Sequence, residues 1–121
     1  MSAAARSLQV WSIYLVALAV ILLVAPNPLL GAFRMAPTSE VWIRVVGMMV
    51  AFVGVYYWVA AATESVPIFR ASVLCRITVP IFFLLFVSAG WAPWSLLLFG
   101  AADLLGAAWT WWALRRAPAT A

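Results

Sequence analysis

The chain has 121 residues, of which 69% are hydrophobic and 8% are charged, and its mean hydropathy is +1.14. This composition excludes a water-soluble globular domain, and the length leaves no room for a separate soluble module. The net charge of +4 does not indicate nucleic-acid binding, because the basic residues are arginines scattered near the ends of apolar segments. Arginines in such places are typical of topology signals and lipid headgroup contacts.

The first predicted membrane span covers residues 8–25 (LQVWSIYLVALAVILLVA). An arginine before an apolar run also fits a signal peptide, but this run is long for a signal core. In addition, Pro26 and Pro28 stand where small cleavable residues belong, so we expect a retained helix. Residues 26–40 are predicted to form an interfacial loop, since they are too apolar to extend freely into water.

Three further spans are predicted at residues 41–62, 67–89 and 94–114. Each contains the roughly 20 residues that cross a hydrocarbon core of about 30 Å. Helices satisfy every backbone polar group within such a segment, whereas an open strand in lipid does not. The sequence therefore predicts an all-α protein, an integral membrane four-helix bundle that forms a single domain over residues 1–121.

The arginines also predict an orientation, because positively charged residues concentrate on the cytoplasmic side of a membrane. Arg6, Arg70, Arg115 and Arg116 fall on one side of the predicted spans. Arg34 and Arg44 fall on the other side. We therefore expect a multi-pass protein of a bacterial inner (plasma) membrane with both termini in the cytoplasm.

The tryptophans provide a separate test of depth. Seven lie near predicted helix ends, as expected of an interfacial aromatic belt: Trp11, Trp42, Trp91, Trp94, Trp109, Trp111 and Trp112. An aromatic-lined ligand pocket is the alternative interpretation.

Asp103 is the most informative charged residue, because it lies near the middle of the last predicted span. A carboxylate at that depth costs at least about 2.5 kcal/mol, so it is expected to face protein and to have a partner. Arg76 is the expected partner, since the two positions differ in depth by only about 4–5 Å. Pro80 adds to this polar centre, because it leaves the carbonyl of Arg76 without its backbone donor.

This centre has two interpretations that the sequence leaves open. One is a structural ion pair that fixes the register of the helices. The other is a polar site that binds a ligand or handles an ion. Arg44 is a third candidate, which either contacts a lipid phosphate at the interface or reaches inward toward Asp103.

Small residues predict where helices approach each other closely. The predicted helix-packing positions are Gly47, Ala51 and Gly54 in the second span and Gly100 and Gly106 in the fourth. Glu64 and Arg70 are expected to form a solvated pair near the loop between the second and third spans.

Several kinds of chemistry have no support in the sequence. Histidine is absent, and Cys75 is the one cysteine, so no metal site, haem ligand or intrachain disulfide is predicted, and Cys75 is expected to be buried. The chain has no glycine-rich phosphate loop and no catalytic triad or carboxylate pair, so no catalytic residue is predicted. Apolar ligands leave little motif, and a lipid, quinone or carotenoid between the helices stays open.

A weak set of motifs resembles a known family. The second span opens with WIRVVG, the third carries Arg76 in its first half, and the fourth contains ADLLGAAWTWWALRR. This layout, over residues 40–116, resembles small bacterial four-helix membrane proteins of the DoxX-like type. The resemblance implies a four-helix bundle and, in some members, association with oxidoreductase partners. The first helix lacks the glutamate of small multidrug transporters.

These observations lead to three functional hypotheses. The first is an accessory or assembly subunit, or a protein that binds a lipid or lipophilic cofactor, with membrane lipids, other membrane subunits or itself as partners. The second is a small dimeric transporter or channel with Asp103 and Arg76 at its centre. The third and least supported is an enzyme acting on a lipid, with Asp103 as its acid.

Overall fold

The computed structural model describes residues 1–116 and is entirely helical and loop within them. The helices are α1 (Ala3–Val24), α2 (Pro26–Ala32), α3 (Trp42–Ala62), α4 (Val66–Ser88) and α5 (Leu96–Arg116). The four long helices have 21–23 residues and are apolar enough to cross a membrane. At about 1.5 Å per residue each spans roughly 32–35 Å. The predicted all-α bundle with four membrane helices is confirmed.

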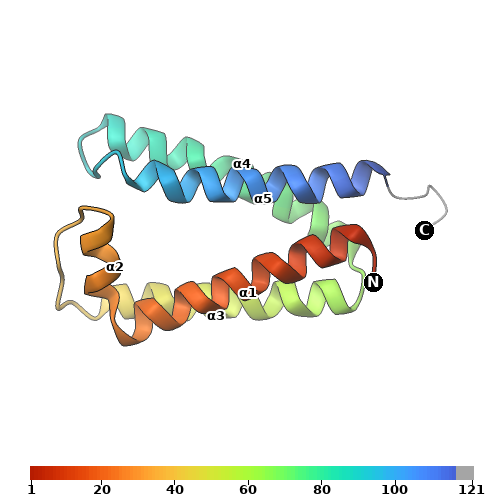
Figure 1. Ribbon diagram of the computed structural model, residues 1–121, viewed down its shortest axis with the longest axis horizontal. Helices are drawn as coiled ribbons and strands as arrows, with labels where there is room; N and C mark the ends of the chain where they lie inside the picture. Colours follow the sequence, from red (N-terminus) through yellow and green to blue (C-terminus); the bar gives the residue numbers. More distant parts are fainter. Residues whose placement is uncertain (117–121) are drawn as a thin grey trace.

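The long helices form two antiparallel pairs (Figure 1). The first pair consists of α1 and α3, the second of α4 and α5, and the two pairs meet mainly where α1 faces α5. The start of α1, the α3–α4 turn and the last turn of α5 lie together at one end of the molecule, called here the packed end. The short helix α2 and the connection between α4 and α5 lie at the other, the open end.

The hydrophobic core lies at the packed end, where all four long helices contribute to one cluster. Its members are Ala4, Ala5, Leu8, Ala60, Ala61, Phe69 and Ala113, with Tyr57 and Leu114 packed against them. The alanines allow the helix backbones to approach closely, and the fully buried Phe69 side chain fills the space between them. The side chains at this end therefore hold the two helix pairs together.

Glycines lie at the close contacts within each pair. A Cβ added to Gly47 would lie 3.0 Å from Leu22, and one added to Gly54 would lie 3.0 Å from Val16. Between α4 and α5, a Cβ added to Gly100 would lie 3.1 Å from the Cα of Pro80. The half-buried Ala51 lies between the two glycines of α3. Small residues thus set the distance between paired helices.

The segment expected to be an interfacial loop, residues 26–40, contains the seven-residue helix α2. The prediction of a loop over this whole stretch is therefore wrong. Proline fits the first turn of a helix, since its missing N–H has no intrahelical partner there, and Pro26 begins α2. The ring of Phe33, just after α2, stacks on Phe99 of α5 with centroids 4.1 Å apart, and Ser95 Oγ donates to the Phe33 carbonyl. These contacts join α2 to the second pair.

Two further expectations are wrong for local reasons. Cys75 was expected inside the protein, but its side chain is exposed on the outer side of α4. Glu64 does not pair with Arg70, because its carboxylate accepts hydrogen bonds from the backbone N–H and Oγ of Ser2, at 2.7 and 2.6 Å. Ser2 Oγ also caps α1 by accepting from Ala5 N–H at 3.0 Å. This cap explains why α1 begins at Ala3, earlier than predicted.

Candidate binding site between the two helix pairs

Arg76 lies inside the bundle, and only 2% of its surface is exposed. Its Nε donates to the Ser72 carbonyl at 3.3 Å, and its Nη2 donates to Ser72 Oγ at 3.1 Å and to Thr110 Oγ1 at 2.8 Å. The guanidinium carbon lies 5.2 Å from the centre of the Trp11 ring, which is a cation–π distance. Side chains of α1, α4 and α5 thus hold the arginine together.

A chain of buried hydroxyl groups continues from Arg76 to α1. Ser7 Oγ lies 2.7 Å from Thr110 Oγ1 and donates to the Ala4 carbonyl at 2.7 Å. A hydroxyl has one hydrogen to donate, and a guanidinium has only donors. Ser7 therefore uses its hydrogen on Ala4, and Thr110 accepts from Arg76 and donates to Ser7. The hydrogen bonds run in one direction from α4 through α5 to α1.

The expected ion pair between Asp103 and Arg76 is not formed. Over residues 1–116, no carboxylate oxygen lies within 4.0 Å of an arginine nitrogen. Asp103 is half-buried and close enough to act on Arg76 electrostatically. However, Ser72 and Thr110 hold the guanidinium nearer to Gly106, where a Cβ would lie 3.1 Å from Nη1.

The arrangement leaves one strong donor without a partner. Arg76 Nη1 is buried and makes no hydrogen bond with any of the described residues. A buried donor that makes no hydrogen bond costs free energy, and the cost is larger for a charged donor than for a neutral donor. This nitrogen therefore marks a place where a further acceptor would be favourable.

Arg44 lies elsewhere, at the open end. Its exposed side chain donates through Nη1 to the carbonyl of Leu23, in the last turn of α1. A cation at a helix C-terminus interacts favourably with the helix dipole. Arg44 therefore reaches the end of α1 and does not reach Asp103, so the inward-pointing alternative is wrong.

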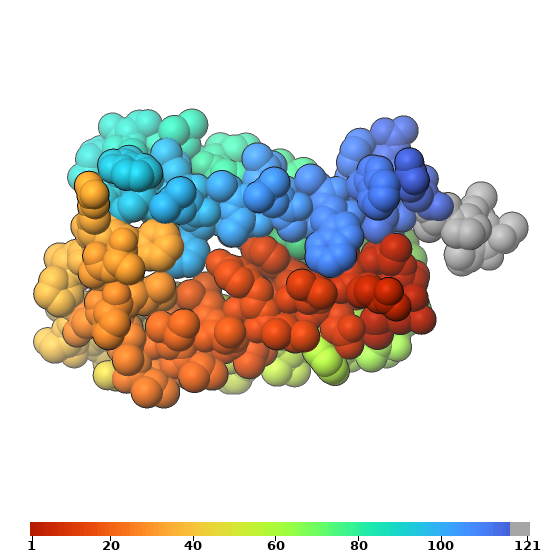
Figure 2. Space-filling view, viewed as in Figure 1, coloured from red at the N-terminus to blue at the C-terminus, as the bar shows by residue number. Residues whose placement is uncertain are grey.

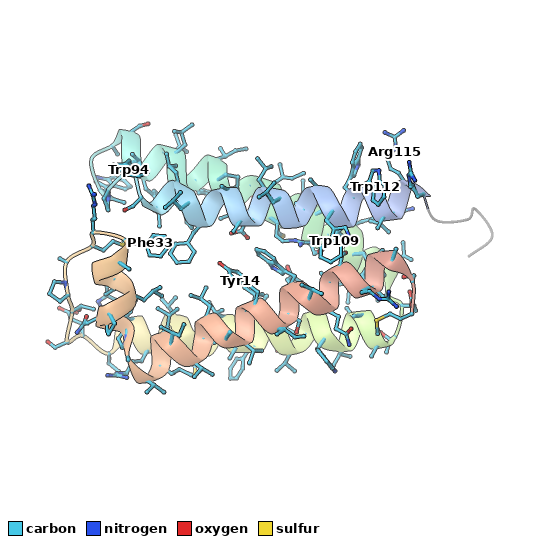
Figure 3. The ribbon with its side chains drawn as sticks, in the orientation of Figure 1. Tyr14, Phe33, Trp94, Trp109, Trp112 and Arg115 are labelled. Carbon is cyan, nitrogen blue, oxygen red and sulfur yellow. The ribbon has the colours of Figure 1, made fainter. Side chains whose placement is uncertain are left out.

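A cavity of about 390 Å³ lies between the pairs, toward the open end. It is lined by Tyr14, Ala17, Leu18, Ile21, Leu29, Phe33, Leu98, Phe99 and Ala102. Figure 2 shows the surface hollowed between α1 and α5, and in Figure 3 Tyr14 and Phe33 face this space. Ala17, Ile21 and Leu98 of the lining are exposed, so this lateral cavity opens sideways, where lipid surrounds the protein.

The two ends of the lateral cavity differ in chemistry. The stacked rings of Phe33 and Phe99 lie at its end near α2. At its other end, the Tyr14 ring packs against Trp11, with centroids 4.7 Å apart, and Trp11 in turn contacts Arg76. Ala102 lines the cavity directly beside Asp103 in the sequence. Tyr14 and Trp11 therefore connect the apolar cavity to the buried Arg76.

Most of the tryptophans agree with a belt at the ends of the bundle. At the packed end, Arg115 stacks on Trp111 at 4.9 Å and Arg116 on Trp112 at 4.5 Å, and Figure 3 shows Trp112 and Arg115 there. Trp11 differs, because it is buried beneath Arg76. Its assignment to the belt is wrong, since α1 begins at Ala3 and places Trp11 more than two turns inside the helix.

The hydroxyl groups that surround Arg76 were not predicted from the sequence. Ser7, Ser72 and Thr110 are fully buried hydroxyl residues in otherwise apolar helices. The spacing of Ser72 and Arg76, four residues apart, places both on one side of a helix. That spacing was a signal available in the sequence.

No protein-family model matches the chain, and no curated protein or solved structure is significantly similar to it. The fold and its four apolar helices define a small multi-pass membrane protein. The resemblance to DoxX-like proteins stays a prediction.

Proposed function

We propose that this protein binds a lipid or another lipophilic molecule between its two helix pairs. The observation that carries the proposal is the lateral cavity, which has apolar walls and opens sideways. Tyr14 of its lining packs on Trp11, which in turn contacts the buried Arg76. The volume of the cavity lies within the range of about 300–1,000 Å³ that is common for small-molecule sites.

We propose that the protein lies in the inner membrane of a bacterium and that its packed end faces the cytoplasm. Four exposed arginines support this assignment: Arg6, Arg70, Arg115 and Arg116 lie in the helical turns nearest that end. Arg34 and Arg44 lie at the open end. The difference between the two ends follows the positive-inside rule.

A role as an accessory subunit would use the outer faces of the helices. In its most apolar stretch, α4 has only 17% of its residues buried within the chain, so much of its surface is free to contact lipid or a partner subunit. The transporter hypothesis has less support, because the walls of the lateral cavity are apolar and offer few ligands to a hydrated ion. Lipid binding is therefore the leading proposal.

The test uses two alanines that are neighbours in α5. Ala102 lines the lateral cavity, whereas Ala101 is exposed and does not. The full chain and its Ala102→Phe and Ala101→Phe variants would be expressed in bacteria and extracted in mild detergent. Native mass spectrometry would then measure retained lipid, and a diazirine-bearing acyl chain would map contacts by photocrosslinking.

We expect the unmodified protein and Ala101→Phe to retain the ligand and to crosslink through residues of α1 and α5 that line the cavity. Ala102→Phe fills the space and is expected to lose both signals. Equal retention by the two variants, or crosslinks spread evenly over all outer faces, would overturn the proposal. A stable complex with another membrane subunit and no lipid in the cavity would favour the accessory role instead.

A further inference from the structure

We infer that the ligand of the lateral cavity has a neutral head that carries a hydroxyl group, as in a long-chain alcohol or an acylglycerol. Its hydroxyl oxygen would accept a hydrogen bond from Arg76 Nη1 and donate one to the Asp103 carboxylate, while its apolar chain lies in the cavity. This inference rests on the proposed function and adds to it the chemistry of the head group.

The first step is the unpartnered donor. Arg76 is 98% buried, since 2% of its surface is exposed, and Nη1 alone among its three nitrogens makes no hydrogen bond with the described residues. Gly106 lies directly against this nitrogen, and a Cβ there would lie 3.1 Å from Nη1 and 2.9 Å from the Trp11 ring. The free donor therefore lies beside α5 and needs an acceptor.

The second step is the position of the carboxylate. Asp103 precedes Gly106 by three residues, which is about 4.5 Å along a helix axis and on the same side of the helix. The carboxylate lies beyond direct ion-pair distance of every arginine in residues 1–116 and accepts no hydrogen bond from them. One oxygen atom that is hydrogen-bonded to both groups can bridge a donor nitrogen and a carboxylate oxygen that are roughly 5–6 Å apart. In the proposed complex, the hydroxyl oxygen of the ligand lies between Nη1 and the carboxylate.

The third step is charge. Arg76 and Asp103 together have no net charge, so a phosphate or carboxylate head would be attracted by one and repelled by the other. A head with only carbonyl oxygens, such as a quinone, would satisfy Nη1 and leave the carboxylate without a donor. A hydroxyl group both accepts and donates. It is the simplest head that satisfies both groups.

The fourth step is the route from head to tail. Ala102 lines the cavity beside Asp103, and Tyr14 lines it opposite, on α1. In the proposed complex, the chain of the ligand leaves the head beside Ala102 and Tyr14 and lies along the apolar walls that extend to Phe33. An amphipathic molecule matches this change from polar to apolar surroundings.

The experiment compares three photoreactive probes that share one diazirine-bearing acyl chain and differ in the head: a monoacylglycerol, its fully O-methylated ether and the free fatty acid. Each would be crosslinked to the full chain in lipid nanodiscs. We expect the monoacylglycerol to label the cavity at least about tenfold more strongly than the ether, since the ether cannot donate to Asp103 and one charge-assisted hydrogen bond accounts for a factor of this size.

Asp103→Asn provides a second measurement. It removes the negative charge with little change in shape, so Arg76 becomes an uncompensated cation. We expect labelling by the fatty acid to rise at least about tenfold relative to the monoacylglycerol. The comparison of alcohol and ether on the unmodified protein needs no variant, so it tests the inference even where Asp103→Asn fails to fold.

The outcomes separate the two proposals. Equal labelling by all three heads, blocked by Ala102→Phe, would overturn the inference about the head group and leave the proposed lipid binding intact. Preference for the fatty acid in the unmodified protein would also overturn it. Labelling of the cavity by no probe would overturn both proposals.

Discussion

The packed end and the open end of this bundle are built from the same four helices, yet they differ in what fills the space between them. At the packed end, alanines and Phe69 bring all four helices into one core, and a chain of hydroxyl groups joins Arg76 to α1. At the open end, Phe33 and Phe99 bridge the pairs through α2 and leave a cavity behind them. The core that packs all four helices and the cavity proposed to bind a ligand therefore lie at different depths of the bundle.

The largest expected effect comes from Phe69→Ala, which empties the centre of the packed end. Phe69 has 0% of its surface exposed, and removal of a fully buried phenylalanine side chain costs about 3–5 kcal/mol. Titration with sodium dodecyl sulfate in mixed micelles, followed by circular dichroism, would measure the loss. Phe82→Ala on the same helix, with 56% exposed, should change stability by less than about 0.5 kcal/mol. Equal losses would contradict the assignment of the core.

Gly54→Leu tests the contact within the first pair. A Cβ at Gly54 would already lie 3.0 Å from Val16, and the Gly54 carbonyl accepts a hydrogen bond from Ser12 Oγ at 2.6 Å. A leucine would push α3 away from α1 and break this bond, at an expected cost of about 1–3 kcal/mol in the same titration. Gly31→Leu is the matched control, since no atom lies within 4 Å of an added Cβ there. A tolerated Gly54→Leu would refute close packing of α1 on α3.

Thr110→Val interrupts the chain of hydroxyl groups with almost no change in volume. It removes the acceptor for Arg76 Nη2 and the donor for Ser7, so we expect a loss of about 1–2 kcal/mol. Thr78→Val is the control, because Thr78 donates only to the nearby Cys75 carbonyl. Equal losses of stability in the two variants would contradict a chain of hydrogen bonds across three helices.

The smallest expected effect concerns pH at the packed end. Hydrogen bonds from Ser2 Oγ and then from Ser2 N–H lower the pKa of Glu64 below its ordinary value of 4.5. A carboxylate whose pKa is lowered on folding adds stability above its unfolded pKa, and this contribution is lost as the pH falls through the folded value. The free energy of unfolding should therefore decrease from about pH 5 downward.

Glu64→Gln should remove this part of the pH dependence, and Ser2→Ala should weaken it. Glu64 adopts a positive φ of 52° after the end of α3, a backbone conformation that glutamine must adopt at the same cost. Glu64→Gln and Ser2→Ala therefore change the hydrogen bonds between these residues without a new backbone strain. Unfolding titrations at several values between about pH 3 and about pH 6 would show the difference. An unchanged pH profile in Glu64→Gln would contradict the assignment.

Much of the fold could be predicted from the sequence, because hydropathy and length alone determine which segments cross a membrane. The candidate site was predicted less well. Depth in the membrane alone predicted that Asp103 pairs with Arg76, whereas the rotation of each helix about its axis decides which side chains meet. Ser72 and Thr110 lie nearer to the guanidinium than Asp103 does, and they hold it by hydrogen bonds.

The helix in residues 26–32 and the burial of Trp11 were missed for related reasons. Pro26 was interpreted as the end of the first helix and the start of a loop, although proline also suits the first turn of a new helix. Trp11 seemed close to a helix end because the start of α1 was placed at residue 8, and the cap by Ser2 moves that start to Ala3. Both errors concern helix boundaries, which hydropathy locates poorly.

The sideways opening of the lateral cavity determines how occupancy should be quantified. Ala17, Ile21 and Leu98 line the cavity and are exposed on the side of the bundle, so in a bilayer a hydrophobic molecule would reach the site by diffusing in the plane of the membrane. Its chemical potential is then set by its mole fraction among the surrounding lipids, and its concentration in the buffer matters only through partitioning. Titrations at fixed buffer concentration but different lipid-to-protein ratios would consequently give different apparent affinities for the same site.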